Sequence, residues 1–342
     1  MSIAKKIYYQ TVQLANLSLL KKIYPGRLLL PYHHLVSDAA VPHIRHLYPY
    51  KGVAAFKKDL DYLLKHFNPV TLQTVISCLR TQTPVPPNSF LLTFDDGLRE
   101  VADVIAPLLF QKGVPAVFFL NSAFLDNQSL FYKFKVSLLI EALQQQEHTP
   151  ATLDALAKVL QCPAPSKQEL IAAIKRITYT SREITTALAD ILGISFQEYL
   201  VKQKPFLDSG QVKTLIDQGF AIGGHSIDHP YYEALPLEEM LTQTRGSVDF
   251  LVNKFGLSYK AFAFPHTDAG IPKAFFDQLL GGSSPDLDII FGTNNHREDI
   301  YPQIFHRFNC ERPGINIEAA VKGIMLYNYL HKKKGTAAIQ RY

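Results

Sequence analysis

The chain has 342 residues, enough for one large domain or two modest ones. Hydrophobic residues make up 47% of it and the mean hydropathy is +0.00, a balance that excludes a disordered or coiled-coil chain. The net charge of +5 is too small and too dispersed to indicate a nucleic-acid-binding protein. No run approaches the ~18 uncharged apolar residues of a membrane span. The three cysteines are too widely spaced for a disulfide framework or a zinc knuckle, which favours a reducing compartment.

The first segment, residues 1–26, predicts an amphipathic helix, because Ile3, Ile7, Leu14 and Leu17 recur at helical spacing. Polar residues interrupt the apolar stretch that an export signal needs. We expect this helix to pack on its own domain. A helix at a membrane surface and a divergent export signal are the alternatives. A cytoplasmic protein is therefore expected, with peripheral attachment at the inner membrane face as a variant.

Strand-like apolar runs then alternate with helical patterns. The predicted strands are 27–33, 90–94, 114–120, 220–224, 259–264, 287–293 and 304–310. The predicted helices among them include 54–66 and 99–112, and another begins after Ser209 and ends at Gly219. Continuous apolar strands separated by helices indicate parallel pairing with both faces covered, which is an α/β fold. Periodicity alone leaves a barrel and a doubly wound sheet as alternatives.

One stretch, residues 124–206, contains only helical patterns. They lie at 132–146, 149–160, 166–177 and 181–192. We interpret the stretch as an all-helical insertion, acting either as a structural cap or dimer surface or as a lid over a cleft. The last segment, 317–342, predicts a helix with a basic tail, whose lysines favour the helix dipole; membrane docking is the alternative.

The most informative motif is a buried strand, LLTF, that ends in Asp95, Asp96 and Gly97. Adjacent carboxylates repel each other, and the carboxyl ends of strands in α/β sheets are where ligands bind. Because successive strand residues point in different directions, one aspartate can bind a cation while the other stays deprotonated as a base. A turn with two solvated aspartates is the alternative.

A second motif, IGGHSIDHP at 222–230, follows another predicted strand. His225 and His229 are four residues apart, a spacing that places two imidazoles on one face of a helical turn. Two neutral imidazoles and one carboxylate make a catalytic zinc-type site with an open position for water. Together with Asp95 and Asp96, the pair therefore indicates a metal site.

These motifs resemble those of a known family. TFDDG at 93–97 and HSxxH at 225–229 are similar to the first two motifs of the polysaccharide deacetylase family (NodB homology), and AFAFP at 261–265 resembles a further strand of it. The resemblance extends from about residue 27 to residue 310. It implies a metal-dependent amide hydrolase on a distorted (β/α) barrel of about seven parallel strands. The barrel would comprise 27–123 and 207–316, with the helical insertion at 124–206.

Carried over to this sequence, the resemblance implies that Asp95 is the general base and that Asp96, His225 and His229 bind a divalent metal. Zinc is the expected ion, although such a ligand set also accepts cobalt, nickel, iron or manganese. The metal would polarise the amide carbonyl and lower the pKa of its water, while Asp95 takes the proton of that water.

The third motif of this sequence departs from the family, because Ala263 stands where many members have an arginine. We expect Arg307 to supply the missing contact to Asp95; a structural or surface ion pair is the alternative. The family's proline motif implies that the backbone N–H of His266 helps to hold the oxyanion.

The general acid is less well marked in the sequence. His306 has the apolar-x-His form of the last family motif and is our candidate, with His296 and His266 as rivals.

For substrate contacts we predict His33, which follows Tyr32 as in one branch of the family, together with Pro265 and Tyr231. The expected substrate is an N-acetylated amino sugar, in a glycan or in a lipid- or nucleotide-linked precursor. A deformylase of a formamido sugar, a deacylase of a small non-sugar amide and a catalytically weak carbohydrate-binding protein are the alternatives.

Overall fold

A computed structural model describes residues 3–24, 28–163, 166–336 and 338–342. Residues 1–2 and 25–27, which belong to the predicted first helix and first strand, lie outside these ranges. The chain divides into two compact units, one of residues 1–38, 50–125 and 206–342 and one of residues 39–49 and 126–205.

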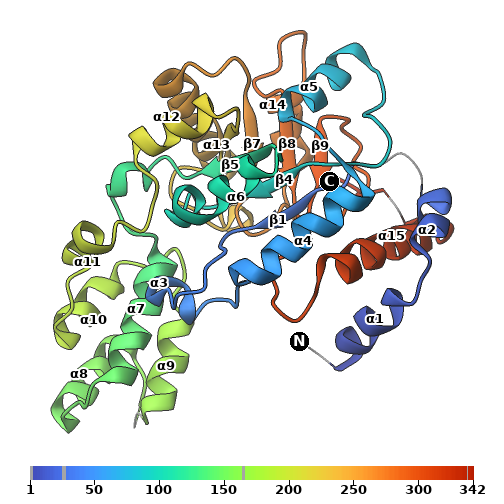
Figure 1. Ribbon diagram of the computed structural model, residues 1–342. Coiled ribbons are helices and arrows are strands. Elements are labelled where there is room, and N and C mark those ends of the chain that lie inside the picture. The colour runs from blue at the N-terminus through green and yellow to red at the C-terminus, as the bar shows by residue number, and fades with distance from the viewer. Residues whose placement is uncertain (1–2, 25–27, 164–165, 337) are drawn as a thin grey trace. The chain divides into compact units, whose positions relative to one another are not determined.

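The first unit is built on an eight-stranded parallel sheet (Figure 1). Its strands are β1 (Pro31–His33), β4 (Leu92–Phe94), β5 (Ala116–Leu120), β6 (Ala221–Gly224), β7 (Ala261–Ala263), β8 (Ile289–Gly292), β9 (Ile304–His306) and β10 (Phe308–Asn309). They lie in the order β10-β1-β4-β5-β6-β7-β8-β9, so two segments that are consecutive in the chain form the two edges. The predicted (β/α) barrel is confirmed. It has eight strands rather than seven because the predicted strand 304–310 divides at Arg307.

Helices surround this sheet. They are α1 (Ile3–Gln13), α2 (Leu17–Ile23), α4 (Val53–His66), α5 (Leu72–Thr81), α6 (Ala106–Gln111), α12 (Ser209–Asp217), α13 (Leu237–Phe255), α14 (Lys273–Leu280) and α15 (Ile317–Lys333). Short elements complete the unit: the strand pair β2 (Asn68–Pro69) and β3 (Ser89–Phe90), a π-helical turn at Val101–Ile105, and 3-10 turns at Leu125–Asn127 and Tyr232–Ala234.

The single helix predicted over residues 1–26 is wrong. Two helices are present, because the Asn16 side chain accepts a hydrogen bond from the Leu19 N–H and begins a new helix there. None of the described helices is long and apolar enough to cross a membrane.

Strand residues alternate between two hydrophobic cores. Leu91, Val117 and Phe119 belong to the core inside the barrel, whereas Phe94 and Phe118 pack outside it with the surrounding helices. This alternation places Thr93 on the inner side of β4. Asp95, the residue that follows the strand, lies on the same side at its carboxyl end.

The second unit is helical, as predicted for this stretch. It contains α3 (Pro42–Arg45), α7 (Tyr132–Gln145), α8 (Pro150–Leu160), α9 (Lys167–Lys175), α10 (Ile184–Leu192) and α11 (Phe196–Gln203). It has a core of its own, which includes Leu139, Leu156 and Leu188. Residues 39–49, which the predicted boundaries gave to the barrel, belong to this unit instead, and His46 bonds to Glu141 of α7 at 2.6 Å.

Candidate active site

The two aspartates of the first motif lie in a tight turn after β4. Asp96 and Gly97 both have positive φ (72° and 64°), and a Cβ at Gly97 would lie 2.8 Å from Leu120. The Asp95 N–H still donates to the His33 carbonyl, at 3.0 Å, as in a strand. The turn therefore sends the two carboxylates in different directions, as the motif predicts.

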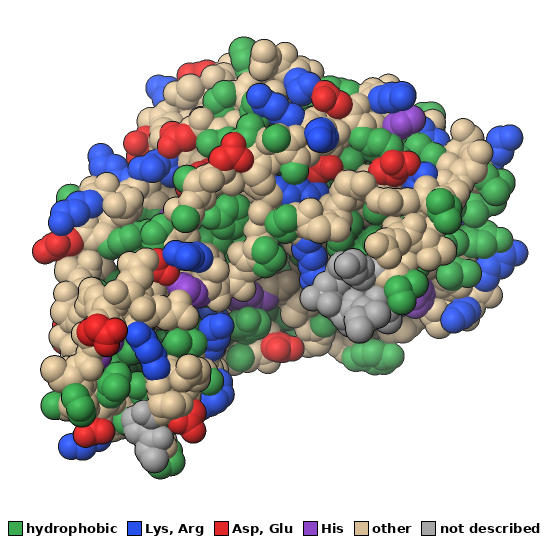
Figure 2. All heavy atoms as spheres, turned by 60° about the horizontal axis from the view of Figure 1, so that its bottom comes forward, with side chains coloured by type: hydrophobic (Ala, Val, Ile, Leu, Met, Phe, Trp, Pro, Cys, Tyr) green, Lys and Arg blue, Asp and Glu red, His purple; other side chains and the backbone are tan. Residues whose placement is uncertain are grey.

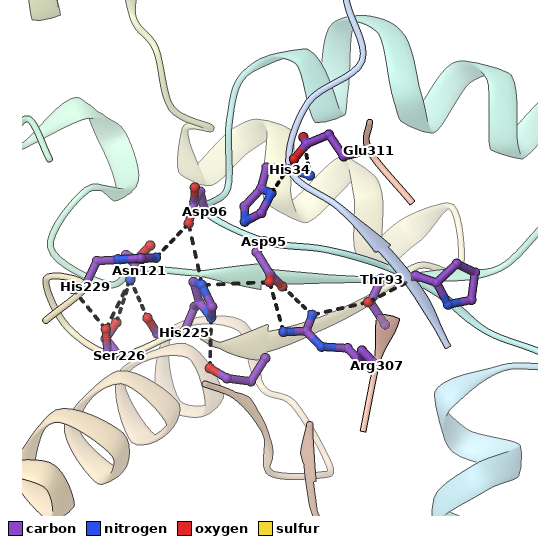
Figure 3. Close-up of polar contacts among 12 residues, drawn as sticks. His34, Thr93, Asp95, Asp96, Asn121, His225, Ser226, His229, Arg307 and Glu311 are labelled. Atoms are coloured by element: carbon purple, nitrogen blue, oxygen red, sulfur yellow. Dashed lines mark hydrogen bonds and ion pairs between the residues drawn. The ribbon is translucent and has the colours of Figure 1, made fainter. Parts of the chain in front are cut away.

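The two histidines of the second motif lie in the loop after β6. Ser226 and His229 have positive φ (68° and 64°), a conformation that costs free energy and needs support. That support comes from Asn121 at the end of β5, whose amide donates to the carbonyl of His225, and from Ser226 Oγ, which accepts from the His229 N–H at 3.0 Å (Figure 3). Asn121 was not identified from the sequence.

Asp96, His225 and His229 converge on one point. Asp96 Oδ1 lies 3.1 Å from His229 Nε2 and 3.5 Å from His225 Nε2, and one ligand atom from each of the three buried residues lies within 4.8 Å of the others. Apart from these contacts within the cluster, neither Asp96 Oδ1 nor His225 Nε2 has a hydrogen-bond partner among the described residues. Buried polar atoms rarely stay unpaired, so these donors fit a cation held between them.

The protonation of this cluster suits a metal. Burial lowers the pKa of His225 to about 4, and His225 Nδ1 lies 2.8 Å from the Ala263 carbonyl oxygen, to which it donates its proton. That hydrogen bond leaves the lone pair on Nε2, facing Asp96. For Asp96, burial raises the pKa, but the nearby His229 outweighs it and the net shift is downward. Asp96 and His225 can therefore present a carboxylate and an imidazole lone pair, and His229 Nε2 faces the same carboxylate oxygen.

Asp95 stands beside this cluster with a different partner. Both of its oxygens accept hydrogen bonds from Arg307, at 2.6 and 2.9 Å, and the guanidinium also donates to Thr93 Oγ1 at 3.2 Å. Arg307 is fully buried between β9 and β10. Burial raises the pKa of Asp95, but Arg307, together with His225 and His34, outweighs that effect and the net shift is downward, so the carboxylate stays ionised. The contact expected in place of the missing third-motif arginine is thus present.

His34, which the sequence did not indicate as a site residue, also faces the two aspartates. His34 Nδ1 lies 2.9 Å from Glu311 Oε2, and the His34 N–H donates to Glu311 Oε1 at 3.0 Å. Its other ring nitrogen is on the side turned toward Asp95 and Asp96 (Figure 3). Burial lowers the pKa of His34, but Glu311, then Asp96 and Asp95, outweigh it and raise the pKa to about 10.

The prediction that His33 contacts substrate is wrong. Its ring packs outside the barrel, stacked on Phe94 and edge-on to Phe56, and it is 1% exposed. Neighbouring residues of a strand point to opposite faces, so the residue that faces the site is His34.

The prediction that His306 is the general acid fails for the same reason. Its neighbour Arg307 points inward to Asp95, whereas the fully buried His306 ring bonds through Nε2 to Asp299, at 2.9 Å. Asp299 and Asp268 are joined in turn by the buried Arg341, at 2.6 and 2.7 Å. His306 therefore belongs to a buried ion-pair network.

The rival His296 is also engaged elsewhere. Its Nε2 contacts the Leu28 carbonyl oxygen, and its Nδ1 lies 3.2 Å from the Tyr24 hydroxyl.

The third-motif loop lies beside the cluster of Asp96, His225 and His229. The His266 ring is edge-on to His229, with centroids 4.4 Å apart, and stacks on Tyr231 at 3.6 Å and 5°. His266 and Tyr231 are partly exposed, whereas Pro265 is buried. The structure thus brings Tyr231 and His266 together at the edge of the site.

Comparison with known proteins agrees with this geometry. The family described as polysaccharide deacetylase matches residues 82–272, which is more than half of the chain. A search of curated proteins finds no match.

Several solved structures are similar in fold. The Streptococcus pyogenes deacetylase PplD in complex with acetate has a TM-score of 0.54 at 12% identity, over 88% of this chain and 99% of that one. IcaB from Ammonifex degensii has a TM-score of 0.51 at 16% identity, over 87% of this chain and 97% of that one. A de-N-acetylase from Aggregatibacter actinomycetemcomitans has a TM-score of 0.51 at 15% identity, over 87% and 99%. With the family match and the barrel, we conclude that this chain belongs to the polysaccharide deacetylase family, the metal-dependent hydrolases of carbon–nitrogen bonds.

Proposed function

We propose that this chain removes the N-acetyl group from an amino sugar of a glycan or of a lipid- or nucleotide-linked glycan precursor. The observation that carries the proposal is that Asp95, held ionised by Arg307, lies beside the Asp96, His225 and His229 cluster, with His34 facing the same point. Hydrolysis of an amide needs a base for the water, an electrophile for the carbonyl and an acid for the leaving amine. In this proposal Asp95 is the base, His34 is the acid, and the three-residue cluster would hold the metal ion that acts as the electrophile.

Asp95 is the proposed general base. Its two hydrogen bonds to Arg307 fix the carboxylate plane, and its Oδ2 lies 4.0 Å from His225 Nε2, close to the ligand cluster. An ionised carboxylate in this position takes a proton from a water that attacks the acyl carbon. Asp96, His225 and His229 would hold a divalent ion, for which we propose zinc, and that ion would polarise the carbonyl and acidify the water.

His34 is the proposed general acid. Glu311 holds the ring through Nδ1, so that the opposite nitrogen is turned toward the aspartates. With a pKa raised to about 10, the imidazole carries a proton at neutral pH and can give it to the departing amine. His34 thereby takes the role that the sequence suggested for His306.

The substrate class is proposed from the surroundings of the cluster. The stacked pair of Tyr231 and His266 presents partly exposed rings next to His229, where a sugar ring can pack. We propose that the backbone N–H of His266 helps to hold the oxyanion. The name of the de-N-acetylase with a similar fold supports an N-acetyl substrate. Removal of a formyl group by the same residues is the second candidate.

The test is release of acetate or formate from a panel of N-acetylated and N-formylated amino sugars by the metal-loaded chain. We expect acetate release, about one divalent ion per chain, and loss of that ion in His225→Ala. Asp95→Asn should keep the ion and lose the activity. Formate release alone would support the second candidate, and sugar binding with no release of either acid would reject both.

The acid needs a separate test. His34→Gln should lower kcat on an unactivated N-acetyl sugar but spare an aryl acetate ester, whose phenolate leaves without protonation. His148→Gln, the same change in the helical unit, is the matched control. Equal loss on both substrates would show that His34 is not the acid.

A further inference from the structure

The helices α1 and α2 expose large apolar side chains. Ile7 is 56% exposed, Leu14 88% and Leu19 57%, and Leu330 at the end of α15 is 46% exposed. Single exposed apolar residues are common on protein surfaces, but here Ile7, Leu19 and Leu330 lie on α1, α2 and α15, and Leu14 lies in the turn after α1. Both α1 and α2 pack against α15. This concentration calls for a physical explanation.

Two of these residues, Ile7 and Leu14, form a stripe. At ~100° per residue they fall within about 20° of one another when α1 is continued to Leu14. The helix uses other residues to pack on the barrel unit: Val12 is 3% exposed, and the Tyr8 hydroxyl donates to the Gly323 carbonyl of α15 at 2.8 Å. The stripe expected to pack on the domain is thus turned outward at Ile7 and Leu14.

Basic residues predominate near this stripe, although α15 also carries Glu318, which pairs with Lys322 at 2.7 Å. Residues 1–27 include five lysine or arginine residues and no aspartate or glutamate. Lys22 is exposed, and α15 ends in the exposed Lys332, Lys333 and Lys334. Figure 2 shows hydrophobic and basic side chains side by side on the right-hand flank, where Figure 1 places α1, α2 and α15.

We propose that α1, α2 and the end of α15 form a docking surface for an anionic lipid bilayer. Ile7, Leu14 and Leu19 would enter the boundary between headgroups and acyl chains, while lysines lie at the level of the lipid phosphates. The charge selects this occupant, because two copies of such a basic surface repel each other whereas anionic headgroups attract it. This inference does not depend on the proposed function.

The test is co-sedimentation of the full chain with vesicles of phosphatidylcholine containing about 30% phosphatidylglycerol. We expect at least about tenfold stronger binding than to pure phosphatidylcholine, and weaker binding as salt is added. The triple variant Ile7→Asp, Leu14→Asp and Leu19→Asp should lower the binding at least about tenfold. Because these side chains are exposed, the variant should keep its melting temperature and its activity on a soluble substrate; Leu14→Asp alone is the fallback if it does not.

Phe110→Asp is the matched control, since Phe110 of α6 is 59% exposed but lies outside this surface. It should leave vesicle binding unchanged. The proposal is overturned if the unmodified chain does not bind the anionic vesicles, if Phe110→Asp weakens binding as much as the triple variant, or if the stripe proves to be a dimer interface that binds no lipid.

Discussion

The pairing of Asp95 with Arg307 predicts a measurable shift in the pH dependence of activity. Arg307 makes two charge-assisted hydrogen bonds to the buried Asp95, at 2.6 and 2.9 Å. Such a bond contributes ~1.5–3 kcal/mol, and one pKa unit corresponds to about 1.36 kcal/mol. Loss of both bonds would therefore raise the pKa of Asp95 by roughly 2–4 units, and loss of one by roughly 1–2 units.

The sign follows from the role of the base. Arg307 lowers the pKa of Asp95 against the upward effect of burial, so the ionised form persists to low pH. In Arg307→Lys, which keeps the charge but not the fork of two donors, Asp95 should become protonated at higher pH. The acid limb of kcat/KM should accordingly move up by about 1–2 pH units, measured as acetate release across pH.

A second buried arginine serves as the control. Arg341 bridges Asp268 and Asp299 but does not touch Asp95. Arg341→Lys should lower stability without moving the acid limb. If Arg307→Lys is active and its acid limb coincides with that of the unmodified chain, Asp95 is not the base or Arg307 does not control its pKa.

Two further results are expected. In Glu311→Gln the charge that raises the pKa of His34 is gone, so the imidazole loses its proton at lower pH, and the alkaline limb of kcat/KM should move down; an unmoved limb would argue against His34 as the acid. In Gly223→Ala the new Cβ would lie 2.5 Å from a ring carbon of Phe119, so the free energy of unfolding in urea should fall by ~1–3 kcal/mol. Gly314→Ala, where nothing lies within 4 Å, should change it little, and equal effects would contradict the packing argument.

The barrel and the cluster of Asp96, His225 and His229 could be predicted because their signals are local. Apolar runs marked all the main strands, and the polar motifs that follow two of them supplied Asp95, Asp96, His225 and His229. Parallel strands end at the same side of a sheet, so motifs at strand ends meet in space even when ~130 residues separate them along the chain.

The errors concern which way a side chain points. The sequence favours His33 where the structure has His34, and it places both His306 and Arg307 in the site although only Arg307 points inward. In each case a shift of one residue exchanges the inner face for the outer one. The pattern of β1 and β9 does not fix this choice, since both faces of these strands are buried. Glu311 and Arg341 were missed because their partners lie far away in sequence and no motif marks them.

The position of Arg307 makes the charge of Asp95 depend on the completion of folding. This residue lies between β9 and β10, which form the two edges of the sheet. Its side chain reaches Asp95, the residue that follows β4. A chain whose final strand has not docked would hold Asp95 without this counter-charge, so any burial of the carboxyl would favour its protonated form. The charge of the proposed base therefore depends on closure of the barrel, and we expect a molecule with an undocked final strand to lack the proposed activity.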